Sequence, residues 1–463
     1  MLLLNKPKPM EYDFKAHIDN PFFRQIFKSC KELSVRGYVI GDYVRDLLLN
    51  RKCDHIDVIT SGNSAALAKK MAKSHDNGIA VRFMDDNQYR RDFTINAMAI
   101  SLNEDDFGTL VDPFDGMGDL EELTIRTPQD PDSCFATDPL LMMRAIRLAT
   151  QLHFYIDPES FYAIARNAEH IKTVHMDRVT EELNKTLLSS RPSTGIMLLD
   201  ECGLLKYILP QLTLLKGVEV IRGHGHKDNF FHTMQVLDQV AEKSDNLWLR
   251  WAALLHDIAK PQTKRWEDGI GWTFHGHEFK GSKMVPKIFA QMKLPPDEKM
   301  KYVQKLVLLH LRPIVLSEDI VTDSAVRRLL FDAGDDIDDL MLLCHADITS
   351  KNEEKIKKYH RNFEIVQDKL KEIEAKDHLR NWQPPIDGKS IMEAFGIGEG
   401  REVGIIKKAI REAILDGVIG NDFEEAYAFM KKVGTEQGLR IVKEIEKPVV
   451  VNNNGPVPKI IEN

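Results

Sequence analysis

The segment "DHIDVIT" (residues 54–60) brings two carboxylates to the start of an apolar run that is typical of a β-strand. Carboxylates two positions apart on a strand share one face and can bridge the Mg²⁺ ions that activate a hydroxyl for attack on a phosphate. Asp54 and Asp57 are three positions apart, so a strand directs them to opposite faces, with His55 between them in the sequence. These two aspartates alone therefore do not predict a metal clamp.

A glycine turn precedes this segment. The run "YVI" leads into Gly41 and Asp42 and then into the helical pattern "YVRDLLLN". A glycine between a strand and a helix lets backbone N–H groups approach a phosphate, and the start of the helix adds positive potential. The layout indicates a phosphate site, but the carboxylate of Asp42 would repel a triphosphate there.

The composition narrows the class of protein. The chain has 463 residues, enough for about three domains, and a formal net charge of -8. This charge speaks against a globally basic nucleic-acid binder but leaves room for a basic face. The five cysteines are scattered and never spaced as CxxC, so we expect neither a disulfide framework nor a thiolate zinc site. No apolar run approaches the roughly 20 residues of a membrane span, so we expect a cytoplasmic protein without membrane partners.

The hydrophobic pattern divides the chain into regions. After an amino-terminal extension (residues 1–34), residues 35–126 alternate strand-like and helical runs, which predicts a small mixed α/β domain. Beyond it, apolar positions recur every three or four residues, which predicts helices. The stretches "IRGHGHKDNF" and "QPPIDG" favour boundaries. We therefore expect an all-α region at 127–222, a histidine-bearing helical region at 223–375 and a helical tail at 376–463.

These segments together resemble a known family. "GDYVRDLLL", "HIDVIT", "RRDFTINAMAIS", "LVDPFDGMGDL", "IRTPQDPDSCFATDPLLMMRAIRLA" and "DRVTEELNKTLL" follow the order found in class II tRNA nucleotidyltransferases, the CCA-adding enzyme and poly(A) polymerase family, of the bacterial kind with an HD domain. The resemblance covers nearly the whole chain. It implies an α+β fold: a nucleotidyltransferase palm, a helical head and neck for nucleotide and RNA, an HD domain and a helical tail.

The resemblance also implies a reaction and its partners. Such an enzyme transfers CMP or AMP from CTP or ATP to the 3′ end of tRNA with the help of Mg²⁺. The partner that it implies is tRNA, held at the acceptor stem and elbow by phosphate contacts, and not DNA.

The palm departs from the family at two positions. The resemblance places His55 and Asp57 at the family's Asp-x-Asp metal pair, with Arg45 nearby as a catalytic residue, and imidazole is a poor ligand for Mg²⁺. Gly41 and Asp42 stand where the family has Gly-Gly or Gly-Ser.

A strand and a template residue also differ. The family has a further strand with a third carboxylate before "RRDFT", and only "MDDNQY" fills its place, with Asp85 or Asp86 as substitutes. In the helix after the palm Asp138 is present, but Leu141 replaces the arginine that pairs with the incoming base and cannot donate a hydrogen bond. The nucleotide-binding residues that remain are Arg91, Asp92, Asn96, Arg144 and Arg147.

The later histidines resemble the HD phosphohydrolase superfamily. The order H…HD…D is supplied by His232, His256, Asp257 and Asp347, with His277 and His310 for a second ion and Lys260 for a phosphate oxygen. Nitrogen and oxygen ligands of this kind suit Mn²⁺, Fe²⁺, Co²⁺ or Ni²⁺, and such a site can activate water toward a phosphate ester.

Three functions stay open from the sequence. The first is nucleotide addition to tRNA 3′ ends, at a site altered at Asp42, His55 and Leu141. The second is an HD-type metal-dependent phosphohydrolase whose transferase domain is inactive. The third is a tRNA-binding protein without catalysis.

Overall fold

The computed structural model describes residues 14–53, 55–72, 80–85, 92–221, 224–225, 228–318, 322–348, 353–377 and 382–447. The chain divides into two compact units, Met1–Gln304 and Lys305–Asn463. The division falls inside one helix, α17 (Glu298–Leu309). Every helix in the described part is too short or too polar to span a lipid bilayer.

The first unit begins with a mixed five-stranded sheet in the order β3-β2-β1-β4-β5. The strands are β1 (Gly37–Ile40), β2 (His55–Thr60), β3 (Ala80–Asp85), β4 (Ala99–Ser101) and β5 (Leu110–Val111). β2 and β3 run parallel, and the other neighbours run antiparallel. Val39, Ile40 and Val58 are fully buried, so the apolar strand positions form the core that holds the sheet.

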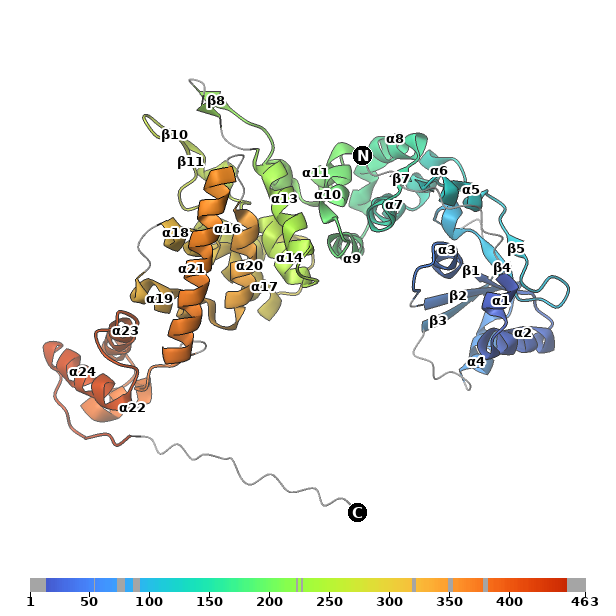
Figure 1. Cartoon of the computed structure of the whole chain (residues 1–463). Coiled ribbons are helices and arrows are strands. Elements are labelled where there is room, and N and C mark those ends of the chain that lie inside the picture. The colour runs from blue at the N-terminus through green and yellow to red at the C-terminus, as the bar shows by residue number, and fades with distance from the viewer. Residues whose placement is uncertain are drawn as a thin grey trace, which may run out of the picture. The chain divides into compact units, whose positions relative to one another are not determined.

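Helices cover this sheet, which lies in the blue part of the chain (Figure 1). They are α1 (Phe14–Ile18), α2 (Pro21–Leu33), α3 (Asp42–Leu48), α4 (Ser64–Met71), the 3₁₀ turn η2 (Thr94–Asn96) and α5 (Gly116–Glu121). α2 packs beside α4, and α3 packs against β1 and β2. The side chain of Asn20 accepts hydrogen bonds from the N–H groups of Phe22 and Phe23, which fixes the start of α2.

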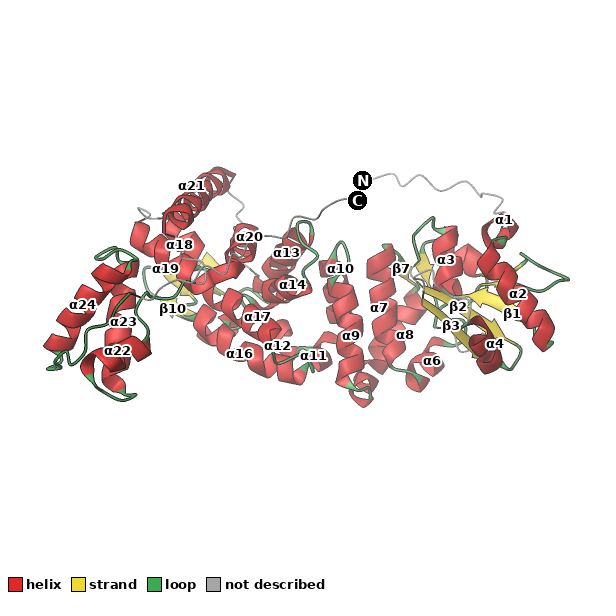
Figure 2. Ribbon diagram, turned by 90° about the horizontal axis from the view of Figure 1, so that it is seen from below, coloured by secondary structure: helices red, strands yellow, loops and turns green. Residues whose placement is uncertain are grey.

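A helical layer follows in the sequence (Figure 2). Its elements are β6 (Thr124–Ile125), α6 (Pro131–Thr137), α7 (Leu140–Leu152), β7 (Tyr155–Ile156), α8 (Pro158–Asn167), η3 (Ala168–Thr173), α9 (Met176–Leu187), α10 (Pro192–Glu201), α11 (Leu205–Ile208) and α12 (Pro210–Thr213). α7 packs on α9 through its apolar face, in which Met142, Met143 and Ile146 are fully buried.

The rest of the first unit carries five of the residues predicted for the histidine site. It contains β8 (Val220–Ile221), β9 (His224–Gly225), α13 (Asn229–Ala241), α14 (Leu247–Leu255), α15 (Lys260–Thr263), β10 (Arg265–Glu267), β11 (Gly271–Thr273) and α16 (His277–Gln291). α13 packs against α14, and Trp251 of α14 is fully buried.

The second unit is helical in its described residues. Its elements are α18 (Arg312–Glu318), α19 (Asp323–Ala333), η4 (Gly334–Asp336), α20 (Ile337–Asp347), α21 (Glu353–Asp377), α22 (Gly388–Phe395), α23 (Arg401–Leu415) and α24 (Phe423–Glu436). α18 and α19 both pack on α21, and α23 packs on α22 and α24.

The predicted fold class is confirmed, with one difference. The strands "GYVI", "HIDVIT" and "AVRF" and the hairpin of β4 and β5 form as expected. Short two-stranded pieces also occur, β6 with β7, β8 with β9 and β10 with β11, and all of these strands except β6 lie in regions predicted to be helical. These runs of two or three residues are too short for a periodic signal. The finer domain boundaries stay predictions.

Candidate nucleotide pocket and histidine cluster

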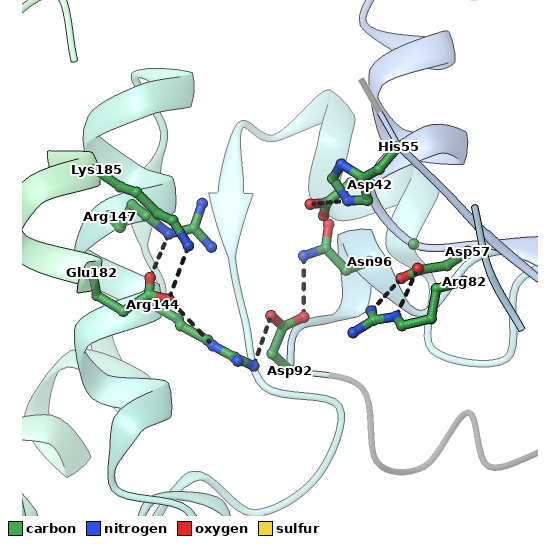
Figure 3. Close-up of a pocket in the computed structure, with 11 residues that line it drawn as sticks. Asp42, His55, Asp57, Arg82, Asp92, Asn96, Arg144, Arg147, Glu182 and Lys185 are labelled. Atoms are coloured by element: carbon green, nitrogen blue, oxygen red, sulfur yellow. Dashed lines mark hydrogen bonds and ion pairs between the residues drawn. The ribbon is translucent and has the colours of Figure 1, made fainter. Parts of the chain in front are cut away.

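A polar pocket of about 360 Å³ lies between the sheet and the helices α7 and α9 (Figure 3). This volume is within the usual range for a small-molecule site. The sheet, the turn between β1 and α3 and the segment before β4 contribute Gly41, Asp42, His55, Asp57, Arg82, Asp92 and Asn96, and the helices contribute Arg144, Arg147, Glu182 and Lys185. The pocket therefore unites six predicted nucleotide-site residues, Gly41, Asp42, Asp92, Asn96, Arg144 and Arg147, with the predicted metal pair.

The turn at Gly41 adopts the conformation that a phosphate turn requires of glycine. Its φ is 81° and its ψ is -137°, a region that side chains other than glycine's rarely enter. The carboxylate of the next residue, Asp42, has partners at both oxygens. It accepts a hydrogen bond from Arg45 Nη1 at 2.8 Å, and its other oxygen lies 3.4 Å from His55 Nε2. The predicted repulsion of a triphosphate by Asp42 is therefore reduced by two cationic neighbours.

Both members of the Asp42–His55 pair have shifted pKa values. Burial opposes ionisation of Asp42, but the His55 hydrogen bond and the charges of Arg45 and Arg147 outweigh it and hold the pKa of Asp42 well below its usual value. The same hydrogen bond raises the pKa of His55, although partial burial opposes the shift. The imidazolium form of His55 is favoured, and this form has no lone pair for a metal.

Asp57 is paired with an arginine that the sequence did not reveal. Asp57 and Arg82 are directly opposed in the parallel register of β2 and β3. Arg82 Nε donates to Oδ1 at 3.0 Å and Nη2 donates to Oδ2 at 2.7 Å, so the guanidinium engages both oxygens of a carboxylate that is only 5% exposed. Such two-point pairs are among the stronger ionic contacts in proteins.

The described palm residues do not fit the Mg²⁺ pair of the family. Of its two positions one is a histidine, and the other is a carboxylate held at both oxygens by a guanidinium. Mg²⁺ requires several oxygen ligands near octahedral positions. Of the predicted substitutes, Asp54 and Asp86 lie outside the described residues, and Asp85 ends β3 with its side chain outside them.

A hydrogen-bond chain links the sheet to the helices. Arg45 Nη1 donates to Asn96 Oδ1 at 2.9 Å, and Asn96 Nδ2 donates to Asp92 Oδ1 at 3.1 Å. Across the pocket, Arg144 Nη1 lies 3.9 Å from Asp92 Oδ2. Asp92 and Asn96 thus form the floor that faces the arginines of α7 (Figure 3).

The helical wall of the pocket is cationic around one buried carboxylate. Glu182 of α9 is 5% exposed and accepts from Arg147 Nε at 2.6 Å. Arg144 Nε and Lys185 Nζ lie 3.7 and 3.8 Å from its other oxygen. Three cations share one carboxylate on this wall, which leaves positive charge available for a phosphate.

The other predicted palm and head residues lie elsewhere. Arg45 lies behind Asp42, is 6% exposed and also donates to Asp46, so it positions neighbours and is absent from the pocket lining. Asp138 ends α6, where its side chain accepts from the N–H of Leu140, and it is also absent from the lining. Arg91 lies outside the described residues.

Sequence reasoning did not single out Arg82, Glu182 and Lys185. The segment "DRVTEELNKTLL" contains the last two at the spacing of one helical face, which is the signal that could have found them. The position of Arg82 opposite Asp57 depends on the register in which β2 pairs with β3. Nineteen residues separate these two strands in the sequence, and no local pattern indicates their register.

A second cluster of predicted residues surrounds Asp257. His232 comes from α13, His256 and Asp257 follow α14, and His277 opens α16 after the hairpin of β10 and β11. His256 Nε2 and His277 Nε2 lie 3.3 and 3.2 Å from the carboxylate of Asp257, and His232 Nε2 lies 3.7 Å from it. Each of the four side chains is at most 7% exposed.

Backbone carbonyls orient two of these imidazoles. His256 Nδ1 is 2.8 Å from the carbonyl oxygen of Ala253, and His277 Nδ1 is 2.8 Å from that of Phe274. This leaves the Nε2 atoms directed at Asp257, as in metal sites, where a carbonyl holds the far side of a ligating histidine. The buried nitrogen and oxygen donors fit a divalent transition metal.

Lys260 and its neighbours keep Asp257 ionised. Burial would raise the pKa of Asp257, but His256 and Lys260 in particular, and a hydrogen bond from His277, hold it well below its usual value. Lys260 Nζ lies 2.6 Å from Asp257 Oδ2 and retains some exposure. The remaining predicted residues, His310 and Asp347, belong to the second unit. There His310 Nδ1 meets the carbonyl oxygen of Val307, and Asp347 ends α20.

A small mixed sheet with a glycine turn, a cationic helical wall and a separate His/Asp cluster define a class of protein with a pocket suited to a phosphate group and a donor set suited to a metal ion. Comparisons with known proteins specify this class. Family models match residues 80–126 ("Poly A polymerase head domain"), 153–215 ("Probable RNA and SrmB- binding site of polymerase A") and 229–352 ("HD domain").

Two curated relatives and one solved structure are similar to the chain. An A-adding tRNA nucleotidyltransferase of Deinococcus radiodurans is 31% identical over 362 residues, which cover 76% of this chain and 80% of the relative. A multifunctional CCA protein of Pseudomonas fluorescens is 31% identical over 313 residues, 59% of this chain and 73% of the relative. The CCA-adding enzyme of Bacillus stearothermophilus in complex with CTP has a TM-score of 0.62 at 22% identity and covers 90% of this chain and 99% of its own. The chain belongs to the tRNA nucleotidyltransferase family.

Proposed function

We propose that the protein acts on the 3′ end of tRNA and transfers CMP or AMP from CTP or ATP to it. The pocket between sheet and helices is the site of the nucleotide. One curated relative is named an A-adding tRNA nucleotidyltransferase and the other a multifunctional CCA protein, and the family models match parts of the palm, the helical layer and the HD region.

The observation that carries this proposal is the cationic wall opposite the glycine turn. Arg144, Arg147 and Lys185 surround Glu182 and face Asp92 and Asn96 across a pocket of nucleotide size. Fixed cations of this kind hold phosphates and stabilise the charge that develops in phosphoryl transfer. Asn96 and Asp92 would orient the nucleotide, and Arg45 would hold them in place through the hydrogen-bond chain that joins the three residues.

The experiment is incorporation of labelled CTP and ATP into tRNA that lacks its 3′ CCA. We expect addition by the full chain, and we expect the double variant Arg144→Ala and Arg147→Ala to lose it by about a hundredfold or more, which corresponds to ~2.7 kcal/mol of transition-state stabilisation. The matched control is Arg24→Ala, an exposed arginine on α2 that pairs with Asp19 away from the pocket. Incorporation that the double variant leaves intact would contradict the proposal, as would its absence in protein that binds tRNA.

A second candidate function is hydrolysis of a phosphate ester at the His/Asp cluster. The observation that favours it is the fit of that cluster to a metal, in contrast to the palm. His232, His256 and Asp257 would hold the ion, and we propose that Asp347 is its further ligand and that His277 serves a second ion with His310, as the resemblance implies. When bound, a divalent transition metal supplies Lewis-acid polarisation of the ester.

The residues around the cluster would bind the ester and shield it from bulk water. Lys260, beside Asp257 and partly exposed, would hold a phosphate oxygen. The buried imidazoles would exclude bulk water from the ester. Hydrolysis of a 2′,3′-cyclic nucleotide or a nucleotide monoester in the presence of Mn²⁺ or Ni²⁺, lost in His256→Ala but kept in Arg144→Ala, is the expected result. No hydrolysis of either ester with any of Mn²⁺, Fe²⁺, Co²⁺ and Ni²⁺ would remove this candidate.

A further inference from the structure

The position of Arg82 has a consequence for how the pocket takes up a nucleotide. Arg82 is not a stray surface group, because the register of β2 and β3 sets its Cα directly opposite that of Asp57. Both oxygens of Asp57 accept from its guanidinium, at 3.0 and 2.7 Å. Most of the Arg82 side chain is nevertheless exposed, at 64%, and it lines the pocket. The guanidinium therefore presents its positive charge to the pocket while it is fixed by a buried carboxylate.

The first position of the family's metal pair, occupied by His55, also contacts a neighbouring side chain. His55 is two residues before Asp57 on the same strand and so shares its face of the sheet. Its Nε2 is directed at Asp42, 3.4 Å away, and the guanidinium of Arg45 holds the other oxygen of Asp42. Each carboxylate on the sheet side of the pocket near the phosphate turn is thus matched by a cationic side chain.

The charge balance of the lining points the same way. The pocket is lined by four carboxylates, Asp42, Asp57, Asp92 and Glu182, and by four permanent cations, Arg82, Arg144, Arg147 and Lys185. A nucleotide site that recruits Mg²⁺ holds the ion with one or two carboxylates, together with water and the phosphates of the substrate. Here a dication beside Asp57 would have to displace Arg82 or lie against its charge, and Coulomb repulsion opposes the second arrangement.

We propose that this pocket binds the triphosphate group of CTP or ATP without Mg²⁺, with Arg82 on one wall and Arg144, Arg147 and Lys185 on the other as the cations that neutralise it. The inference rests on the proposed nucleotide site and changes its cofactor requirement. Planar guanidinium groups suit phosphate oxygens at two points, which a fixed arginine pair on opposite walls can supply.

The test is equilibrium binding of labelled CTP and ATP to the full chain in excess EDTA and again in excess Mg²⁺. We expect the dissociation constant in EDTA to lie within about threefold of the value in Mg²⁺, whereas a metal-dependent site loses tenfold or more. Arg82→Gln should weaken binding in EDTA by about tenfold. The matched control is Arg36→Gln, because Arg36 is also an exposed, ion-paired arginine of the palm but pairs with Asp105 and Asp106 away from the pocket.

A loss of binding in EDTA that Mg²⁺ restores would overturn the inference, and so would Arg82→Gln binding as tightly as the unaltered chain. Thermal melting would show whether Arg82→Gln is folded. Where it is not, Arg82→Lys, which keeps the charge but loses the two-point contact, should weaken EDTA binding by a smaller factor, and unchanged binding would count against the inference.

The outcome is separable from that of the proposed function. Binding in EDTA without incorporation into tRNA would sustain the inference and remove nucleotide addition. Incorporation with binding that requires Mg²⁺ would do the reverse.

Discussion

The pair of Asp42 and His55 should be detectable as a titration. The hydrogen bond and charge of Asp42 raise the pKa of His55 above its ordinary value of 6.5. We expect NMR of protein labelled at histidine carbons to show His55 titrating above that value. Because the pKa is raised on folding, the contribution of the pair to stability is present below 6.5 and is lost as the pH rises through the folded pKa.

The control for this titration is Asp42→Asn, which removes the charge and keeps the shape of the side chain. It should return the pKa of His55 toward 6.5. A His55 that titrates at or below 6.5 in the unaltered chain would show that the pair does not form in solution.

Restoring the carboxylate of the family's metal pair should not restore a metal site. In His55→Asp the new carboxylate lies near Asp42, a like charge, while Arg82 still engages both oxygens of Asp57. We expect this single variant to change incorporation into tRNA by less than about threefold, under ~0.7 kcal/mol of barrier height. Incorporation by His55→Asp that is a hundredfold or more higher in the presence of Mg²⁺ would contradict the conclusion that the palm residues do not fit this ion.

The individual site residues were partly predictable. The sequence motifs pointed to Gly41, Asp92 and Asn96, and the pocket contains all three, because each motif sits at the end of a strand or at a turn whose place in the sheet is fixed. Asp138, predicted to bind the nucleotide, caps the end of α6, and Arg45, predicted to be catalytic, is a buried anchor behind Asp42; both roles stay predictions. Side-chain direction at such positions depends on packing, which sequence spacing does not specify.

At the scale of elements, close helix packing in the second unit gives a testable contrast. A Cβ added at Gly434 of α24 would run into the ring of Phe395, at the end of α22, whereas a Cβ at Gly404 of α23 would meet nothing. Overpacking of this kind costs about 1–3 kcal/mol. We expect Gly434→Ala to lower the free energy of unfolding by that amount in a urea titration.

Gly404→Ala is the matched control, since it makes the same substitution in a neighbouring helix. An exposed helical glycine replaced by alanine gains about 0.5–1 kcal/mol because the unfolded chain loses freedom. The two variants should therefore differ in sign. Equal effects would mean that Phe395 moves aside and that the contact between α22 and α24 is loose.

Elements were easier to predict than contacts. The strands and the long amphipathic helices followed from periodicity, because one buried face forces a repeat of two or of about 3.6 residues. The pairing of β2 with β3 did not, because parallel strands are joined through a distant helix and any register satisfies the same local pattern. The ion pair of Asp57 with Arg82, which occupies the remaining carboxylate of the family's metal pair, depends on that register.

For the molecule as a whole, the palm and the His/Asp cluster around Asp257 should respond differently to metals. The buried His/Asp cluster has the donors for a divalent transition metal, whereas the palm carboxylates are held by cations. A metal that binds only the folded chain stabilises it by about 2.7 kcal/mol when present at 100 times its dissociation constant. We expect Mn²⁺ or Ni²⁺ to raise the melting temperature of metal-free protein by several degrees, and Mg²⁺ at the same concentration to raise it much less.

The variants assign that shift to one region. His256→Ala should abolish the rise caused by Mn²⁺ or Ni²⁺, and His170→Ala, which removes an exposed histidine on η3, should leave it unchanged. Asp57→Ala should also leave this rise unchanged, because Asp57 binds the guanidinium of Arg82 and not a metal ion. A rise that His256→Ala retains and Asp57→Ala removes would reverse the assignment: the palm would be the metal site, Arg82 would have to give way to the ion, and the cluster around Asp257 would be a structural ion-pair network.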